Sequence, residues 1–197
     1  MDKLVIDIET KNTFADVGGQ SNIEAMEASF VGVYSYNDNK YYSFFEDKFA
    51  DLGKMLQKAG LIIGFSINRF DIPVMRKYFE PENRFSTGVN FNIMALSRYD
   101  ILDELEETLG FRVGLDLLAK ANLNIGKTHH GLEAIKFYKE GNFKELEAYC
   151  INDVKITKDL YDLIQKQGHL DVPSKYSTQT IRADFKPKDI FTPPTLF

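Results

Sequence analysis

The segment KLVIDIET, residues 3–10, constrains the fold more than any other part of the chain. Its apolar residues are typical of a short strand that is covered on both faces. Side chains alternate along a strand, so Asp7 and Glu9 share one face. Two neighbouring carboxylates on a buried strand are unfavourable unless a partner balances them, and a divalent cation prefers such oxygen ligands. The alternative is a strand end at which both acids face water.

Length, composition and charge then limit the class of protein. The 197 residues, 44% hydrophobic and 27% charged, indicate a soluble globular protein with one domain and at most a small appendage. The chain contains no apolar run of membrane-spanning length, no signal-peptide pattern at its start and a single cysteine, Cys150. These absences predict a cytoplasmic protein without a membrane partner. The net charge of −5 argues against coating nucleic acid by bulk electrostatics, but not against a nuclease that binds metal ions.

The order of the predicted elements indicates a mixed α/β sheet. Strands are expected at 3–10, 29–36, 41–45 and 61–65. The first three are close enough in sequence to form an antiparallel meander. A helix is expected over 49–59, with Gly60 ending it. Further helices are expected at 70–79, 100–109, 115–121, 132–139 and 142–165.

The composition changes after Gly168. Four of the six prolines lie within 173–194, which predicts an extended arm that either docks on the domain or binds a partner. The expected organisation is a domain over 1–167 and an arm over 168–197. The last six residues, TPPTLF, weakly resemble peptides that bind sliding clamps, so a replication or repair protein is a candidate partner of the arm.

Two further groups of polar residues stand on predicted elements. Asp71 follows a buried strand and opens a helix, where capping and the helix dipole alone would explain an acid. Tyr149 and Asp153 are four residues apart on the last long helix and share one face at the margin of its apolar side. Singly, they also fit an ordinary amphipathic helix. His129 and His130 lie between glycines and indicate a solvated loop rather than a metal site.

In their order along the chain, these residues resemble the three motifs of the DEDD superfamily of 3′–5′ exonucleases. The first motif, D-x-E, is in DIET; the second is similar to GFSINRFDIPVM; and the third, Y-x-x-x-D, is in YCIND. Ala148 occupies the position at which another branch has histidine, so the resemblance is to the tyrosine branch. From about residue 3 to 164, the chain is similar to stand-alone predicted exonucleases of the ribonuclease H-like group and to proofreading domains of family-B DNA polymerases.

The resemblance implies a fold and a metal site. The fold would be a ribonuclease H-like α/β domain with a mixed five-stranded sheet flanked by helices. Two divalent cations, Mg²⁺ or Mn²⁺, would be bound, with Asp7 bridging both. The same resemblance implies that Glu9 and Asp153 complete the site that activates water. It also implies that Asp71 supports the second ion through coordinated water. Tyr149 would orient the attacking water by a hydrogen bond rather than act as general base.

Five residues near the motifs are candidate substrate contacts: Thr10, Lys11, Ser66, Asn68 and Arg69. The second motif of the superfamily usually has asparagine five positions before its acid. This chain has Ser66 there and Asn68 two positions later, which affects substrate geometry more than metal binding. For Arg76 and Lys77, a phosphate contact and a generic charged surface are about equally supported.

The implied activity is hydrolysis of phosphodiester bonds at the 3′ end of single-stranded nucleic acid, with DNA favoured and nucleoside 5′-monophosphates released. Two alternatives stay open on the sequence alone. One is an RNA 3′-trimming exonuclease of the same fold, because recognition of the 2′-hydroxyl needs only one or two contacts. The other is a non-catalytic nucleic-acid-binding subunit of a replication or repair assembly.

Overall fold

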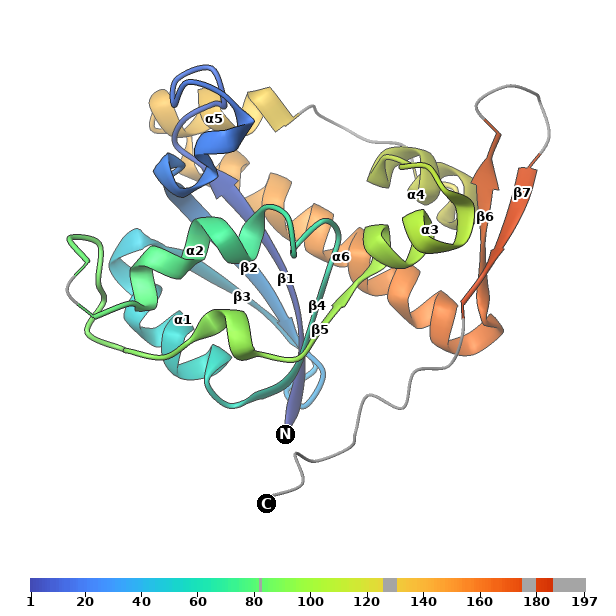
Figure 1. The fold of residues 1–197 in the computed structure, drawn as a ribbon, viewed down its shortest axis with the longest axis horizontal. Helices are drawn as coiled ribbons and strands as arrows, with labels where there is room; N and C mark the ends of the chain where they lie inside the picture. Colours follow the sequence, from blue (N-terminus) through green and yellow to red (C-terminus); the bar gives the residue numbers. More distant parts are fainter. Residues whose placement is uncertain (82, 126–130, 175–179, 186–197) are drawn as a thin grey trace.

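A five-stranded sheet organises the computed structural model, which describes residues 1–81, 83–125, 131–174 and 180–185 (Figure 1). Its strand order is β3-β2-β1-β4-β5. The first three strands pair antiparallel, whereas β4 pairs parallel with both β1 and β5. This confirms the predicted mixed α/β sheet. The strands are β1 (Asp2–Thr10), β2 (Ala28–Ser35), β3 (Lys40–Phe45), β4 (Ala59–Gly64) and β5 (Arg98–Asp100).

Helices cover both faces of the sheet. The alternation of β1 sends Leu4 and Ile6 into a core with the first two α-helices, and Val5 into a core with the third, fourth and sixth. Asp7 and Glu9 continue the Val5 side, against the sixth helix. The helices are α1 (Phe49–Leu56), α2 (Asp71–Phe79), α3 (Ile101–Leu109), α4 (Leu115–Leu123), α5 (Gly131–Lys139) and α6 (Phe143–Gln167), with 3₁₀ turns η1 (Gln20–Ala25), η2 (Glu46–Lys48) and η3 (Ile93–Ala95).

The largest differences from the sequence prediction lie at the end of α1 and at β5. The helix expected over 49–59 ends at Leu56, and Gly60 belongs to β4 instead of ending the helix. Apolar spacing continues across this boundary because the helix and the buried strand both need apolar residues. Strand β5 was not predicted, since three residues are too few for an alternating pattern.

The described residues after α6 form a β-hairpin. Gly168 ends α6 with a left-handed φ of 74°, and β6 (His169–Pro173) and β7 (Thr180–Asp184) follow as an antiparallel pair. Leu170 and Val172 are buried in the core that contains α4 and α6. The division at residue 168 stays a prediction. The TPPTLF segment, like His129 and His130, lies outside the described residues. Among the described helices, none has the length and apolar character needed to cross a membrane.

Candidate active site

Gly32 on β2 allows α6 to approach the sheet beside Asp7. The two residues are register partners in the β1–β2 pair. A Cβ atom at Gly32 would lie 2.9 Å from Cγ2 of Val154 and 3.2 Å from Sγ of Cys150, both on α6. No side chain therefore fits between strand and helix at this point. The absence of a side chain brings the polar residues of α6 to the acids of β1.

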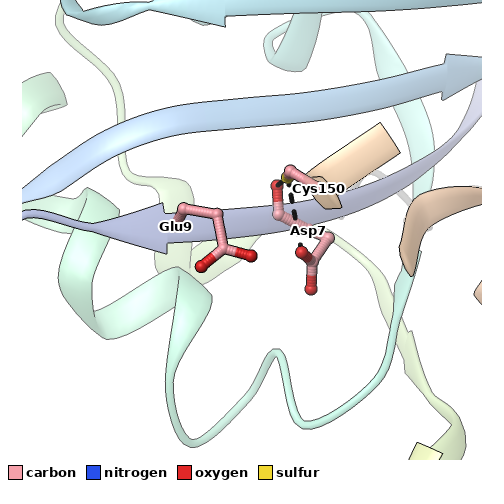
Figure 2. A group of neighbouring side chains, drawn as sticks. All are labelled: Asp7, Glu9 and Cys150. Atoms are coloured by element: carbon pink, nitrogen blue, oxygen red, sulfur yellow. Dashed lines mark hydrogen bonds between the residues drawn. The ribbon is translucent and has the colours of Figure 1, made fainter. Parts of the chain in front are cut away.

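The carboxylates of Asp7 and Glu9 lie on the same side of β1, and Cys150 lies beside Asp7 (Figure 2). One candidate ligand atom from each side chain lies within 4.8 Å of the others. The thiol of Cys150 donates to the backbone oxygen of Asp7 at 3.3 Å and to its Oδ2 at 3.4 Å. Cys150 was not predicted as a residue of the site. Its position next to Tyr149 on the same helix was the available signal.

Four carboxylates converge from three elements. Loss of hydration raises the pKa of Asp7 well above its usual value, and the charges of Glu9, Asp71 and Asp153 raise it further. The hydrogen bond from Cys150 acts in the opposite direction. Glu9, Asp71 and Asp153 are all buried. So many carboxylates in a buried cluster need protons or cations to balance their charge.

Asp71 provides the test of whether a cation fits. It is the first residue of α2, and only 3% of its surface is exposed. Burial raises the pKa of Asp71 to about 8, although backbone N–H groups of Asp71 itself and of Ile8 lower it. Its Oδ1 atom is buried without a hydrogen-bond partner among the described residues. A hard divalent cation binds several carboxylate oxygens, and here an oxygen without a hydrogen-bond partner lies beside other carboxylates. The residues therefore fit such an ion.

Tyr149 lies beside these acids on α6, one turn before Asp153. Both residues are buried, with 6% of each exposed. Burial raises the pKa of the Tyr149 phenol, and the charges of Asp153, Glu9 and Asp7 raise it further. The hydroxyl therefore stays protonated and can donate a hydrogen bond, which makes it unsuited to remove a proton.

Comparison with protein families assigns the fold. The family model of the RNase H superfamily matches residues 4–165. The chain belongs to the RNase H superfamily. This confirms the predicted ribonuclease H-like fold. No curated protein matches the sequence.

Solved structures support the same assignment of the RNase H superfamily fold. The family B DNA polymerase of Pyrobaculum calidifontis superposes with a TM-score of 0.60 at 16% identity, over 84% of this chain and 24% of the polymerase. Exonuclease I of E. coli, in its zinc-bound complex with single-stranded DNA, gives a TM-score of 0.53 at 17% identity, over 84% of this chain and 41% of that one. Likeness at these identities shows the fold. This chain spans about a quarter of the length of the polymerase and about two fifths of that of exonuclease I.

Within this RNase H superfamily chain, Asp100 fixes the turn that leads to Asp71. Ser66 has a left-handed φ of 68°. The Asp100 carboxylate accepts hydrogen bonds from the backbone N–H groups of Ser66 at 2.8 Å, Asn68 at 2.9 Å and Leu102 at 3.0 Å. One carboxylate thus holds the turn before α2 and caps the start of α3. Asp100 was predicted as the first residue of a helix, and this role was not predicted.

We expect Asp100→Ala to lower the free energy of unfolding by about 2 kcal/mol, because two partly buried N–H groups of the turn and the buried N–H group of Leu102 lose their acceptor. Urea denaturation followed by circular dichroism measures this. Asp51→Ala is the control, since Asp51 makes an exposed ion pair with Lys54. Equal stability of the two variants would show that Asp100 does not hold the turn.

The two basic candidates for substrate contact have acidic partners. Lys11 lies 2.7 Å from Glu46 and 3.5 Å from Glu27. Arg69 lies 2.7 Å from Glu106. These exposed or half-buried pairs are weak enough to exchange for phosphate contacts. The substrate roles of Lys11 and Arg69 stay predictions.

The three polar candidates also have protein partners. Thr10 donates to the backbone oxygen two residues along the chain at 2.9 Å. The Ser66 hydroxyl accepts from Arg112 at 3.2 Å. The Asn68 side chain accepts from Arg98 at 2.6 Å and donates to Asp103 at 2.8 Å. In this structure Asn68 supports the turn, and substrate contact by all three stays a prediction.

Proposed function

We propose that this protein is a metal-dependent 3′–5′ exonuclease that acts on single-stranded nucleic acid, with DNA favoured, and releases nucleoside 5′-monophosphates. The observation that carries this proposal is the convergence of four carboxylates from β1, α2 and α6 beside Tyr149. Membership of the RNase H superfamily supports it. So does the structural likeness to E. coli exonuclease I, which was solved with single-stranded DNA.

The chain's own residues would hold the metal ions. Asp7 has the other three acids as neighbours, so we assign it as the shared ligand, with Glu9, Asp71 and Asp153 around it. Hard carboxylate oxygens favour Mg²⁺ or Mn²⁺. When bound, a pair of such cations stabilises the attacking and leaving oxygens of an in-line displacement at phosphorus. The packing of α6 against β1 and β2 keeps the ligands in fixed positions.

Tyr149 would position the attacking water. Its raised pKa keeps the phenol protonated, so the hydroxyl holds water by hydrogen bonding. We expect Tyr149→Phe to lower kcat about tenfold with little change in KM, because a positioning contact is lost and strand binding is kept. Steady-state kinetics measures both constants. Tyr99→Phe, which removes a phenol hydroxyl from β5, is the control. An unchanged kcat for Tyr149→Phe would remove Tyr149 from this role.

An end-labelled strand tests the proposed function. A single-stranded DNA oligonucleotide labelled at its 5′ end is incubated with the protein and Mg²⁺ or Mn²⁺. We expect a ladder of labelled strands that shortens from the 3′ end, and no products when EDTA is present. A parallel RNA oligonucleotide decides between DNA and RNA as the preferred substrate. An intact strand under all metal conditions would leave only a non-catalytic binding role.

A further inference from the structure

A cavity of about 420 Å³ lies between α2, η1 and the segment that follows α2. Arg76, Lys77 and Arg84 line it, together with the acids Glu24 and Glu80. Arg76 is already neutralised, because its guanidinium pairs with Glu80 and also lies 3.5 Å from Glu24. The capacity of the cavity to bind an anion therefore depends on the other two cations.

Lys77 holds an ammonium group in a nearly buried position. Only 9% of the residue is exposed, and its Nζ atom donates to the backbone oxygen of Glu24 at 3.0 Å. Among the described residues, no carboxylate lies within ion-pair distance of it. Burial lowers the pKa of Lys77, and the charges of Arg84 and Lys11 lower it further, whereas the charges of Glu27 and Glu24 raise it. An anion beside this ammonium would stabilise its charged form against burial and against the repulsion by Arg84 and Lys11.

Phe85 holds the two cations at the cavity without neutralising them. Its ring centroid is 4.7 Å from Nζ of Lys77 and 4.6 Å from Cζ of Arg84. The Arg84 side chain is 80% exposed, and Glu27 is 3.9 Å away. Two positive charges thus lie around one ring, and both residues line the cavity.

The cavity is connected to the acidic site through α2. The helix begins with Asp71, and Lys77 is six residues further, about 9 Å along the axis. Lys11, which directly follows β1, contacts Glu27 at 3.5 Å, and Glu27 also faces Arg84. Glu27 therefore lies between Lys11 at the end of β1 and Arg84 at the cavity.

We propose that this cavity binds a backbone phosphate of the single-stranded substrate, upstream of the 3′ end that reaches the four acids. The identity of the strand rests on the proposed function. Lys77 would contact the phosphate as a point charge, and Arg84 through its planar pair of N–H donors. Because the contact is to the backbone, it adds affinity without selecting a base sequence.

Binding measurements in EDTA test this site without turnover. The full-length protein and the variants Lys77→Met, Arg84→Gln and the double variant are titrated into a fluorescent single strand of about 12 nucleotides. Anisotropy is recorded over a range of salt concentrations. We expect about threefold weaker binding for each single variant and about tenfold for the double. The slope of log K against log salt should fall by about 0.7 for each lost contact.

A matched control separates this cavity from the charge of the whole protein. Lys54→Met with Arg182→Gln removes the same charge from surface ion pairs elsewhere, and its affinity should stay near that of the native protein. An equal loss in this control would overturn the assignment. An unchanged salt slope for Arg84→Gln would overturn it too, and that exposed residue can be replaced without unfolding even if Lys77→Met unfolds.

Two further outcomes distinguish the possible ligands and the two proposals. Inorganic phosphate is added to the complex of protein and strand. If phosphate displaces the strand at a concentration as low as the strand concentration needed for binding, the cavity is a small-anion site and the assignment to a strand is wrong. If the labelled strand is never cleaved but the slope still falls in the cavity variants, the nuclease proposal fails and the phosphate site stands.

Discussion

Asp7→Asn is expected to reduce hydrolysis of single-stranded DNA by about 10³-fold or more while the protein stays folded. Asp7 has Glu9, Asp71 and Asp153 as charged neighbours, so it is the acid that links β1 to α2 and α6. An amide of the same shape keeps the packing but removes the charge that binds a cation. Initial rates at saturating Mg²⁺ or Mn²⁺ measure the effect. Near-native turnover of Asp7→Asn would contradict the assigned site.

The same substitution should lower the activity but raise the stability of the metal-free protein. In EDTA, the removal of one of four mutually repelling carboxylates should raise the free energy of unfolding by about 1 kcal/mol, which is about 3 °C in Tm for a chain of this size. Mn²⁺ should raise the Tm of the native protein but leave that of Asp7→Asn nearly unchanged. Asp51→Asn, at an exposed ion pair, is the control. A native protein with the same Tm in Mn²⁺ and in EDTA would contradict cation binding.

Gly32→Val is expected to cause the second largest loss of turnover, because the added side chain lies between β2 and α6. Even a Cβ atom would lie 2.9 Å from Val154 and 3.2 Å from Cys150. Helix α6 must then move away from the sheet, and Tyr149 and Asp153 move with it. We expect a loss of about 2 kcal/mol in the free energy of unfolding and a fall in turnover of at least tenfold. Urea denaturation and initial rates measure the two effects.

The size of the added side chain provides the internal comparison. Gly32→Ala should show a smaller loss of stability and turnover than Gly32→Val. Gly114→Ala is the matched control, because a Cβ atom there meets nothing within 4 Å and its φ of −77° suits any residue. Native turnover in Gly32→Val would show that the close approach of α6 is not needed.

The sequence was most informative where chemistry restricts the residue types. An apolar strand that carries Asp7 and Glu9 has few stable solutions, and the order of the three motifs predicted which distant elements meet it. The structure brings Asp71, Tyr149 and Asp153 to that strand. Their roles in catalysis stay predictions. The α/β sheet followed from the same information, since the periodicities of its longer strands and helices are distinct.

The features that the sequence did not reveal depend on contacts between segments far apart in the chain. Gly32 is one of 13 glycines, and only the position of α6 shows why it has no side chain. Asp100 reads as an ordinary helix start until the turn at Ser66 is seen to bond to it. The phosphate cavity joins Lys77 on α2 to Arg84 and Phe85 beyond it, around a ring that reads as core. Such tertiary contacts leave no local pattern.

The most direct test of the central claim is to locate Mn²⁺ in crystals by anomalous scattering, with a nucleoside 5′-monophosphate present. The expected result is anomalous density enclosed by the carboxylates of Asp7, Glu9, Asp71 and Asp153, and its loss in Asp7→Asn. Density found only at other positions, with these four carboxylates making no contact to it, would contradict the claim that they form a metal site.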